Sequence, residues 1–191
     1  MTWIKICGIT TVADALAATD LRASAIGLIF AESPRKVSIE TARAIATAVR
    51  GRTEVVGVFR EASRVEAVHA AIGLDRAQIH GVEAIETPLR ILRVIRPNQI
   101  GPHLSAREGE ITLIDGSEGR GETFDWTLAR LVPAPFVLAG GLTAENVGRA
   151  IAVARPFGVD VCSGIEIAPG RKDLEDLRRF FDAVRRADDP R

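Results

Sequence analysis

The stretch Trp3-Ile4-Lys5-Ile6-Cys7-Gly8 is short, rich in apolar residues and closed by a glycine, which is typical of a strand buried in a parallel sheet. Alternation along a strand places Lys5 and Cys7 on the same face. Thr11 and Asp14 have the spacing of a capping box, so a helix is expected to begin directly after this strand. Cys7 then lies at the carboxyl end of the strand and near the positive end of a helix, where the pKa of a thiol falls. The stretch predicts either a reactive thiolate or a small buried hydrophobic side chain.

The composition excludes several classes of protein. Lys and Arg together number 25, as do Asp and Glu, so no basic field indicates a nucleic-acid partner. No apolar run approaches the roughly 20 residues that span a bilayer, and the amino terminus enters a strand without an apolar signal core. The two cysteines, Cys7 and Cys162, stand at opposite ends of the sequence, as expected in a reducing compartment. We expect a cytoplasmic protein with no nucleic-acid or membrane partner.

Strands and helices alternate along the whole chain. Apolar segments predict seven further strands, at 25–30, 54–59, 76–80, 99–103, 111–114, 136–139 and 158–161. Predicted helices separate most of them, including one from about Glu83 to Ile95 and a last one from about Asp173 to Arg186. This succession predicts an α/β fold, and eight strands favour a single closed (β/α)8 barrel, a TIM barrel, over residues 1–191, abbreviated around the fifth βα unit. An open flavodoxin-like sheet is the alternative, and it would leave several strands unplaced.

Residues with useful chemistry gather at the carboxyl ends of these strands, where barrels of this kind hold their active sites. We expect one rim to carry a thiol, a guanidinium, an imidazole, a carboxylate and two glycine-containing turns, namely Cys7, Arg35, His80, Asp115, Gly140-Gly141 and Ser163-Gly164. The two turns follow the seventh and eighth strands, which is the usual phosphate site of the fold. Each feature also has an ordinary explanation, since Asp-Gly and Gly-Gly are common in turns and Arg35 could be a solvated loop charge.

Several other kinds of site are not indicated. The three histidines are scattered along the chain and the cysteines are far apart, so no metal-ligand spacing is found. The sequence has no nucleophile elbow with a Ser-His-Asp order. It also has no Gly-x-Gly-x-x-Gly after the first strand, the signature of a dinucleotide site.

Five segments occur in order along the chain: Lys5-Ile6-Cys7-Gly8-Ile9-Thr10, Gln78-Ile79-His80-Gly81, Phe124-Asp125-Trp126, Ala139-Gly140-Gly141-Leu142 with Asn146-Val147, and Val159-Asp160-Val161-Cys162-Ser163-Gly164-Ile165-Glu166. Together they resemble the phosphoribosylanthranilate isomerase family of tryptophan biosynthesis, and the likeness covers nearly the whole chain. The resemblance implies an Amadori rearrangement of N-(5′-phosphoribosyl)anthranilate to the corresponding 1-deoxyribulose phosphate.

The resemblance also implies roles for individual residues. The cysteine matching Cys7 is the family's general base and the aspartate matching Asp115 is its general acid. The arginine matching Arg35 binds the anthranilate carboxylate, and the turns matching Gly140-Gly141 and Ser163-Gly164 bind the phosphate. His80 is expected to contribute to substrate binding rather than to act as the base. No cofactor is expected, because the substrate's own amine nitrogen serves as the electron sink. The expected partner is a phosphorylated, anionic small molecule, and the protein is expected to be a monomer or a homodimer.

Three departures from the family pattern are visible. The loop 116–122 after Asp115 is short and lacks the common Gly-Gly-Thr-Gly run, and the predicted fifth strand lacks its usual Lys-Ala. Cys162 stands where the family often has serine. Two alternatives therefore stay open: another phosphosugar enzyme on the same barrel, which would not need Cys7 and Asp115 together, and a non-catalytic phosphosugar-binding barrel.

The position of Lys5 in the first strand predicts one further contact. Alternation directs its ammonium group into the barrel beside Cys7, where an unpaired charge is costly. In a closed barrel the eighth strand neighbours the first, and Asp160 lies on the same face as Cys162. We therefore predict a buried Lys5–Asp160 ion pair, the alternatives being a pair with Asp115 or a solvated ammonium.

Overall fold

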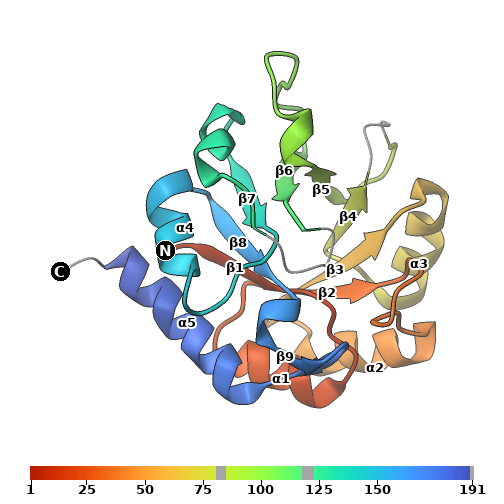
Figure 1. The fold of residues 1–191 in the computed structure, drawn as a ribbon. Coiled ribbons are helices and arrows are strands. Elements are labelled where there is room, and N and C mark those ends of the chain that lie inside the picture. The colour runs from red at the N-terminus through yellow and green to blue at the C-terminus, as the bar shows by residue number, and fades with distance from the viewer. Residues whose placement is uncertain (81–84, 118–122, 190–191) are drawn as a thin grey trace.

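Eight parallel strands close into a barrel in the computed structural model, which describes residues 1–80, 85–117 and 123–189 (Figure 1). The strands are β1 Trp3–Ile6, β2 Ala25–Ile29, β3 Glu54–Phe59, β4 Arg76–His80, β5 Arg90–Ile95, β6 Glu110–Asp115, β7 Phe136–Ala139 and β8 Gly158–Val161. β1 pairs with both β2 and β8, so the sheet has no edge. The predicted closed (β/α)8 barrel is thereby confirmed, and the open flavodoxin-like sheet is excluded.

In the part of the chain that the structure describes, five α-helices pack around the outside of the barrel (Figure 1). They are α1 Val12–Asp20, α2 Ile39–Val49, α3 Val65–Ile72, α4 Val147–Ala154 and α5 Leu174–Asp188, and the 3-10 segments η1 Ala62–Arg64, η2 Pro97–Gln99, η3 Trp126–Leu131 and η4 Ser163–Ile165 lie between strands and helices. A short hairpin of β9 Glu166–Ala168 and β10 Arg171–Lys172 follows β8. Side chains of Thr11, Ser38 and Asp173 cap α1, α2 and α5 by accepting backbone N–H groups of the first turn. Within the described residues, no helix combines the length and the hydrophobicity that crossing a bilayer requires.

The prediction for the fifth βα unit was wrong in detail. The segment 90–95, expected to end a helix, is strand β5, and 99–103, expected to be the fifth strand, lies at the end of η2 and in the turns after it. Ile91-Leu92-Arg93-Val94-Ile95 is buried at every position, as suits a strand covered on both faces. Pro97 and Pro102 lack the N–H that a central strand must donate. The unit is nevertheless abbreviated, since only η2 separates β5 from the turns before β6.

Residues 85–89, between β4 and β5, also form no helix, and 81–84 lie outside the described residues. The side of the barrel around β5 and β6 therefore has a thinner cover than the side that carries α1 and α5 (Figure 1). The carboxyl ends of all eight strands still meet on one rim, because the strands themselves keep their order and direction.

The apolar core has two layers. The larger layer lies between the barrel and its helices, and a smaller cluster fills the interior of the barrel, made of Ala25, Val56, Leu92, Val94, Leu113, Val137 and Ala139. The interior also holds two charged residues at neighbouring positions, since Lys5 of β1 is in register with Asp160 of β8. Lys5 is also in register with Ala25, a member of the smaller cluster, so the two charges adjoin that cluster inside the barrel.

Candidate active site

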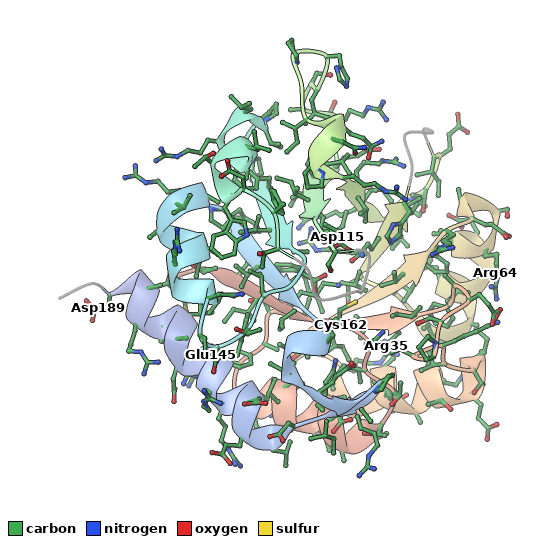
Figure 2. All side chains as sticks on the ribbon, viewed as in Figure 1. Arg35, Arg64, Asp115, Glu145, Cys162 and Asp189 are labelled. Atoms are coloured by element: carbon green, nitrogen blue, oxygen red, sulfur yellow. The ribbon has the colours of Figure 1, made fainter. Side chains whose placement is uncertain are left out.

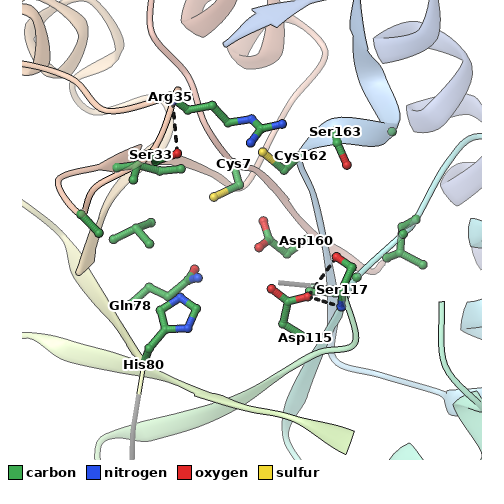
Figure 3. A pocket seen from close by; sticks show the side chains of 18 of the residues that line it. Cys7, Ser33, Arg35, Gln78, His80, Asp115, Ser117, Asp160, Cys162 and Ser163 are labelled. Carbon is green, nitrogen blue, oxygen red and sulfur yellow. Dashed lines mark hydrogen bonds between the residues drawn. The ribbon is translucent and has the colours of Figure 1, made fainter. Parts of the chain in front are cut away.

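A cavity of about 760 Å³ opens at the carboxyl ends of the strands. Its lining includes every site residue that the sequence predicted: Cys7, Arg35, His80, Asp115, Gly140, Gly141, Ser163 and Gly164 (Figure 3). Figure 2 shows Arg35, Cys162 and Asp115 grouped around the open end of the barrel, whereas the labelled residues Arg64, Glu145 and Asp189 lie on its periphery. Residues far apart in the sequence thus meet in one place because parallel strands end on one rim.

Cys7 follows β1 and is fixed by its backbone. Its N–H donates to the carbonyl of Val161 on β8 at 2.8 Å, which continues the β1–β8 ladder by one residue. The neighbouring position on β2 is Gly27, where a Cβ atom would come within 2.9 Å of the Cys7 sulfur. The missing side chain therefore gives the thiol its space inside the rim.

The Cys7 sulfur is in a setting that favours the thiolate. A hydrogen bond from the thiol of Cys162 lowers the pKa of Cys7 well below its usual range, against the opposing effect of burial, and the charge of Lys5 lowers this pKa further. The same hydrogen bond, together with burial, raises the pKa of the Cys162 thiol. Cys7 is therefore the thiolate and Cys162 the hydrogen-bond donor, although most of the chain separates the two residues in the sequence.

The predicted Lys5–Asp160 ion pair is confirmed. Lys5 Nζ lies 2.9 Å from Asp160 Oδ1, and the two side chains are 0% and 7% exposed. Burial raises the pKa of Asp160 to about 7, although the charge of Lys5 acts in the opposite direction. Burial disfavours the ammonium form of Lys5, but the negative charges of Asp160 and Cys7 outweigh it and raise the pKa of Lys5 above its usual value. One buried cation therefore serves both the carboxylate and the thiolate.

We expect Asp160→Ala to lower the free energy of unfolding by about 3–5 kcal/mol, because it leaves the Lys5 ammonium buried without its carboxylate partner. Denaturant unfolding at pH 8 measures this loss. The control is Asp20→Ala, which removes a pair with Arg52 whose side chains are 68% and 51% exposed, and which should cost at most about 1 kcal/mol. Equal effects of the two substitutions would contradict the structural importance of the buried pair.

Asp115 is the last residue of β6 and faces Cys7 across the cavity (Figure 3). Its Oδ1 accepts hydrogen bonds from the backbone N–H of Ser117 at 2.9 Å and from the Ser117 hydroxyl at 3.3 Å. The carboxylate is therefore oriented by the turn that follows the strand, as in an Asx turn. Part of the short loop that the sequence singled out, 118–122, lies outside the described residues.

The two glycine-containing turns lie against each other. A Cβ atom on Gly164 would meet the carbonyl oxygen of Leu142 at 1.9 Å, so only glycine permits this approach. Asn146 shapes the other turn, since its Oδ1 accepts the N–H of Thr143 at 2.8 Å and its Nδ2 donates to the carbonyl of Gly141 at 2.8 Å. The turn precedes α4, which begins at Val147. Adjacent turns of this kind can present several backbone N–H groups to one anion.

Arg35 reaches the cavity from the loop after β2 and makes a bidentate ion pair that sequence reasoning missed. Its Nε lies 3.0 Å from both carboxylate oxygens of Glu166, and its Nη2 lies 2.8 Å from Oε2. The sequence does not predict this role of Glu166, because the hairpin that turns it towards Arg35 has no clear sequence signal.

Other lining residues were also missed. The sequence assigns no role to Gln78, yet this residue lines the cavity. Its buried Oε1 has no hydrogen-bond partner among the described residues. Arg96 follows β5 directly and lines the cavity, a position that the misplaced fifth strand concealed. Within the described part of the chain, no group of three His, Cys, Asp or Glu side chains is placed to hold a metal ion.

A family model described as "N-(5'phosphoribosyl)anthranilate (PRA) isomerase" matches residues 4–183. This chain belongs to the N-(5′-phosphoribosyl)anthranilate isomerase family. An N-(5′-phosphoribosyl)anthranilate isomerase of Pseudomonas aeruginosa (strain LESB58) is 44% identical over 199 residues, which cover 95% of this chain and 94% of that protein. The sequence resemblance to this family is thereby confirmed, as is the class of enzyme, an isomerase of tryptophan biosynthesis.

Two solved isomerases of the family bear on the ligand and on assembly. One, in complex with reduced 1-(o-carboxyphenylamino)-1-deoxyribulose 5-phosphate, has a TM-score of 0.81 and 31% identity, over 97% of this chain and 99% of that one. The other is a monomeric form generated from the dimeric enzyme of Thermotoga maritima, with a TM-score of 0.78 and 30% identity over the same shares of the two chains. A phosphorylated ligand and a dimer therefore both occur among relatives of this fold.

Proposed function

We propose that Cys7 is the general base and Asp115 the general acid with which this member of the family isomerises N-(5′-phosphoribosyl)anthranilate. The observation that carries the proposal is the placement of these two side chains on opposite sides of one cavity, which Arg35 and the turns at Gly140-Gly141 and Ser163-Gly164 also line (Figure 3). The substrate has a ring carboxylate at one end and a phosphate at the other, so it is matched to such a cavity at both ends.

The reaction begins with opening of the furanose ring, which needs a proton on the ring oxygen. Asp115 in its protonated form is the donor, and the hydrogen bonds from Ser117 hold the carboxyl group towards the cavity. The lone pair of the amine nitrogen expels the ring oxygen and forms a protonated imine. No cofactor is needed, because this nitrogen accepts the electrons of the next step.

The second step removes the C2′ proton and shifts the double bond. The Cys7 thiolate is placed for this task on the side of the cavity opposite Asp115, and Lys5 stabilises the thiolate from below. The resulting enolamine rearranges to the ketone product. A non-catalytic binding barrel would need neither the lowered pKa of Cys7 nor the carboxylate across from it.

Substrate binding is assigned to the remaining lining groups. The N–H groups of the turns at Gly140-Gly141 and Ser163-Gly164 bind the phosphate, and Arg35 binds the anthranilate carboxylate. His80 lines the wall at the end of β4, and Gln78 offers its Oε1 to a hydroxyl or amine hydrogen of the substrate. The substrate is then held at both ends while the reacting carbons lie between Cys7 and Asp115.

Arg35→Ala should weaken binding of the carboxylated ring by about 1.5–3 kcal/mol, the value of a hydrogen bond to a charged group. We expect a higher KM and a lower affinity for the reduced product analogue. The affinity for an analogue that lacks the ring carboxylate should change little. Titration calorimetry with both compounds measures it. An equal loss for both analogues would contradict the assignment.

The pH profile of kcat/KM should depend on the hydrogen bond between the thiols of Cys162 and Cys7. Because deprotonated Cys7 is the active base, we expect kcat/KM to rise as pH rises through its lowered pKa. Cys162→Ala removes the donor to the thiolate, so the rising limb should move to higher pH by about 1–2 units. Cys162→Ser retains a donor and should leave the limb close to that of the wild type. A profile unchanged by the alanine substitution would show that Cys162 does not control the base.

The function itself is tested by growth. The gene should restore growth without tryptophan to a strain that lacks this isomerase, and genes with Cys7→Ala or Asp115→Asn should not. Failure of the wild-type gene, with the folded protein present in the cells, would contradict the proposed function.

The setting of the enzyme is also a proposal. We place the reaction in the cytoplasm, since both cysteines are free and the catalytic one must stay reduced. We expect the protein to be a monomer or a homodimer, and sedimentation distinguishes the two.

A further inference from the structure

Three charged side chains, those of Arg35, Glu166 and Lys172, form a cluster beside the cavity. Glu166, whose side chain is 4% exposed, contacts two cations at once: Arg35 through both oxygens and Lys172 through Oε1 at 2.9 Å. Lys172 is 0% exposed and also donates to the carbonyl oxygen of Cys162 at 3.2 Å. Glu166 Oε1 accepts the N–H of Gly170 at 3.2 Å as well. A carboxylate so fully occupied has one fixed orientation.

The shape of the Arg35–Glu166 contact leaves one part of the guanidinium free. Glu166 binds the edge made by Nε and Nη2, and Nη1 has no partner among the described residues. The five N–H donors of a guanidinium lie in one plane in a fixed fork, so holding one edge also fixes the direction of the remaining donors. Arg35 lines the cavity and extends along its rim beside Cys162 (Figure 3).

The hairpin of β9 and β10 explains how Glu166, which lies beyond β8 in the sequence, comes to hold Arg35 in place. β9 begins at Glu166 and β10 ends at Lys172, so the two members of the ion pair face each other across the hairpin, where their positions are paired. The Thr10 hydroxyl donates to the carbonyl of Gly170 and ties the hairpin to the loop after β1. Although burial disfavours its charge, hydrogen bonds from Arg35 and the charge of Lys172 lower the pKa of Glu166. The carboxylate is therefore a permanent anion on a rigid support.

We infer that Glu166 is a positioning residue, which orients Arg35 in advance so that its free donors meet the substrate carboxylate. An arginine side chain that is ordered before binding loses less conformational freedom when the ligand arrives. Lys172 compensates the charge of Glu166, so the cluster as a whole keeps a positive charge for the anionic ring. This inference rests on the role proposed above for Arg35.

A double-mutant cycle on ligand affinity tests the inference. The variants are Glu166→Gln, Arg35→Ala and the double variant, and the probes are the reduced product analogue and its counterpart without the ring carboxylate. Glu166→Gln should weaken binding of the carboxylated probe by about 5- to 20-fold, the effect of having to order one long side chain. It should change the affinity for the other probe by less than about twofold. In the Arg35→Ala background the same substitution should have no further effect, because the group that it orients is gone.

The matched control is Glu54→Gln, which breaks a second bidentate pair at the opposite end of the barrel. Glu54 and Arg76 are the first residues of β3 and β4, with Arg76 Nε 2.8 Å from Oε2 and Nη2 2.9 Å from Oε1. Thermal unfolding should register this loss, and neither probe should bind differently. If Glu166→Gln does not fold, Glu166→Asp replaces it, since aspartate keeps the negative charge of the cluster but shortens the side chain that holds Arg35.

Four results would overturn the inference. Unchanged affinity in both Glu166 variants would show that Arg35 needs no support. An equal loss for the two probes, or a loss that persists in the Arg35→Ala background, would show that Glu166 acts on the fold rather than through Arg35. If Arg35→Ala itself leaves the affinity for the carboxylated probe unchanged, the proposed role of Arg35 fails and the inference fails with it.

Discussion

Replacing Cys7 with alanine is expected to abolish isomerisation while the fold and the binding of a product analogue stay nearly intact. The substitution removes the only group that the mechanism uses to take the C2′ proton, and the loss of a positioned base costs about 10²–10⁴ in rate. Alanine is smaller than cysteine and fits the space beside Gly27. Lys5 keeps its other partner, Asp160, so its buried ammonium group stays paired.

The measurement is kcat of the purified variant, with binding of the reduced product analogue as the test of integrity. Cys7→Ser provides a second arm, because an alcohol of similar size has a far higher pKa than a thiol and should rescue little activity. A kcat near that of the wild type in Cys7→Ala would remove Cys7 from the mechanism. Loss of analogue binding together with activity would point instead to a binding role.

Asp115→Asn should have the second largest effect, a decrease in kcat of about 10² or more for a lost general acid. The amide oxygen can still accept the hydrogen bonds from Ser117, so the geometry of the turn is retained and only the proton is lost. We therefore expect a change in kcat with little change in the affinity for the product analogue.

Asp125→Asn is the matched control for this substitution. Asp125 Oδ1 accepts the N–H of Thr127 at 3.0 Å and its hydroxyl at 2.8 Å, the same local arrangement on the exposed start of η3. The control should leave kcat unchanged. If Asp115→Asn also leaves it unchanged, the proton for ring opening comes from another group.

The sequence was sufficient to predict the barrel because its strands are apolar, short and separated by turn residues. It was also sufficient to predict which residues line the cavity, since they follow the carboxyl ends of the strands. The Lys5–Asp160 pair was predictable because alternation and barrel closure place these two side chains next to each other. The fifth unit was misassigned because a fully buried strand such as 90–95 lacks the alternation that separates strand from helix. The weakly apolar segment 99–103 follows Pro97 and contains Pro102, and it is not a strand.

The contacts of Cys162 and Glu166 could not be predicted in the same way. Cys162 approaches Cys7 only because β1 and β8 are neighbours, and the sequence gives no local signal that one thiol donates to the other. Glu166 reaches Arg35 through a two-stranded hairpin of three and two residues, which is too short for a periodic pattern. Both contacts depend on side chains from distant segments, which periodicity within one segment does not describe.

The most direct test of the central claim is the conversion of N-(5′-phosphoribosyl)anthranilate by the purified wild-type chain after dialysis against a metal chelator, followed by chromatography of the product. The acid–base mechanism predicts complete conversion to the 1-deoxyribulose phosphate, with no added cofactor. Binding of the reduced product analogue without any conversion of substrate would contradict it, and would identify the barrel as a binding protein.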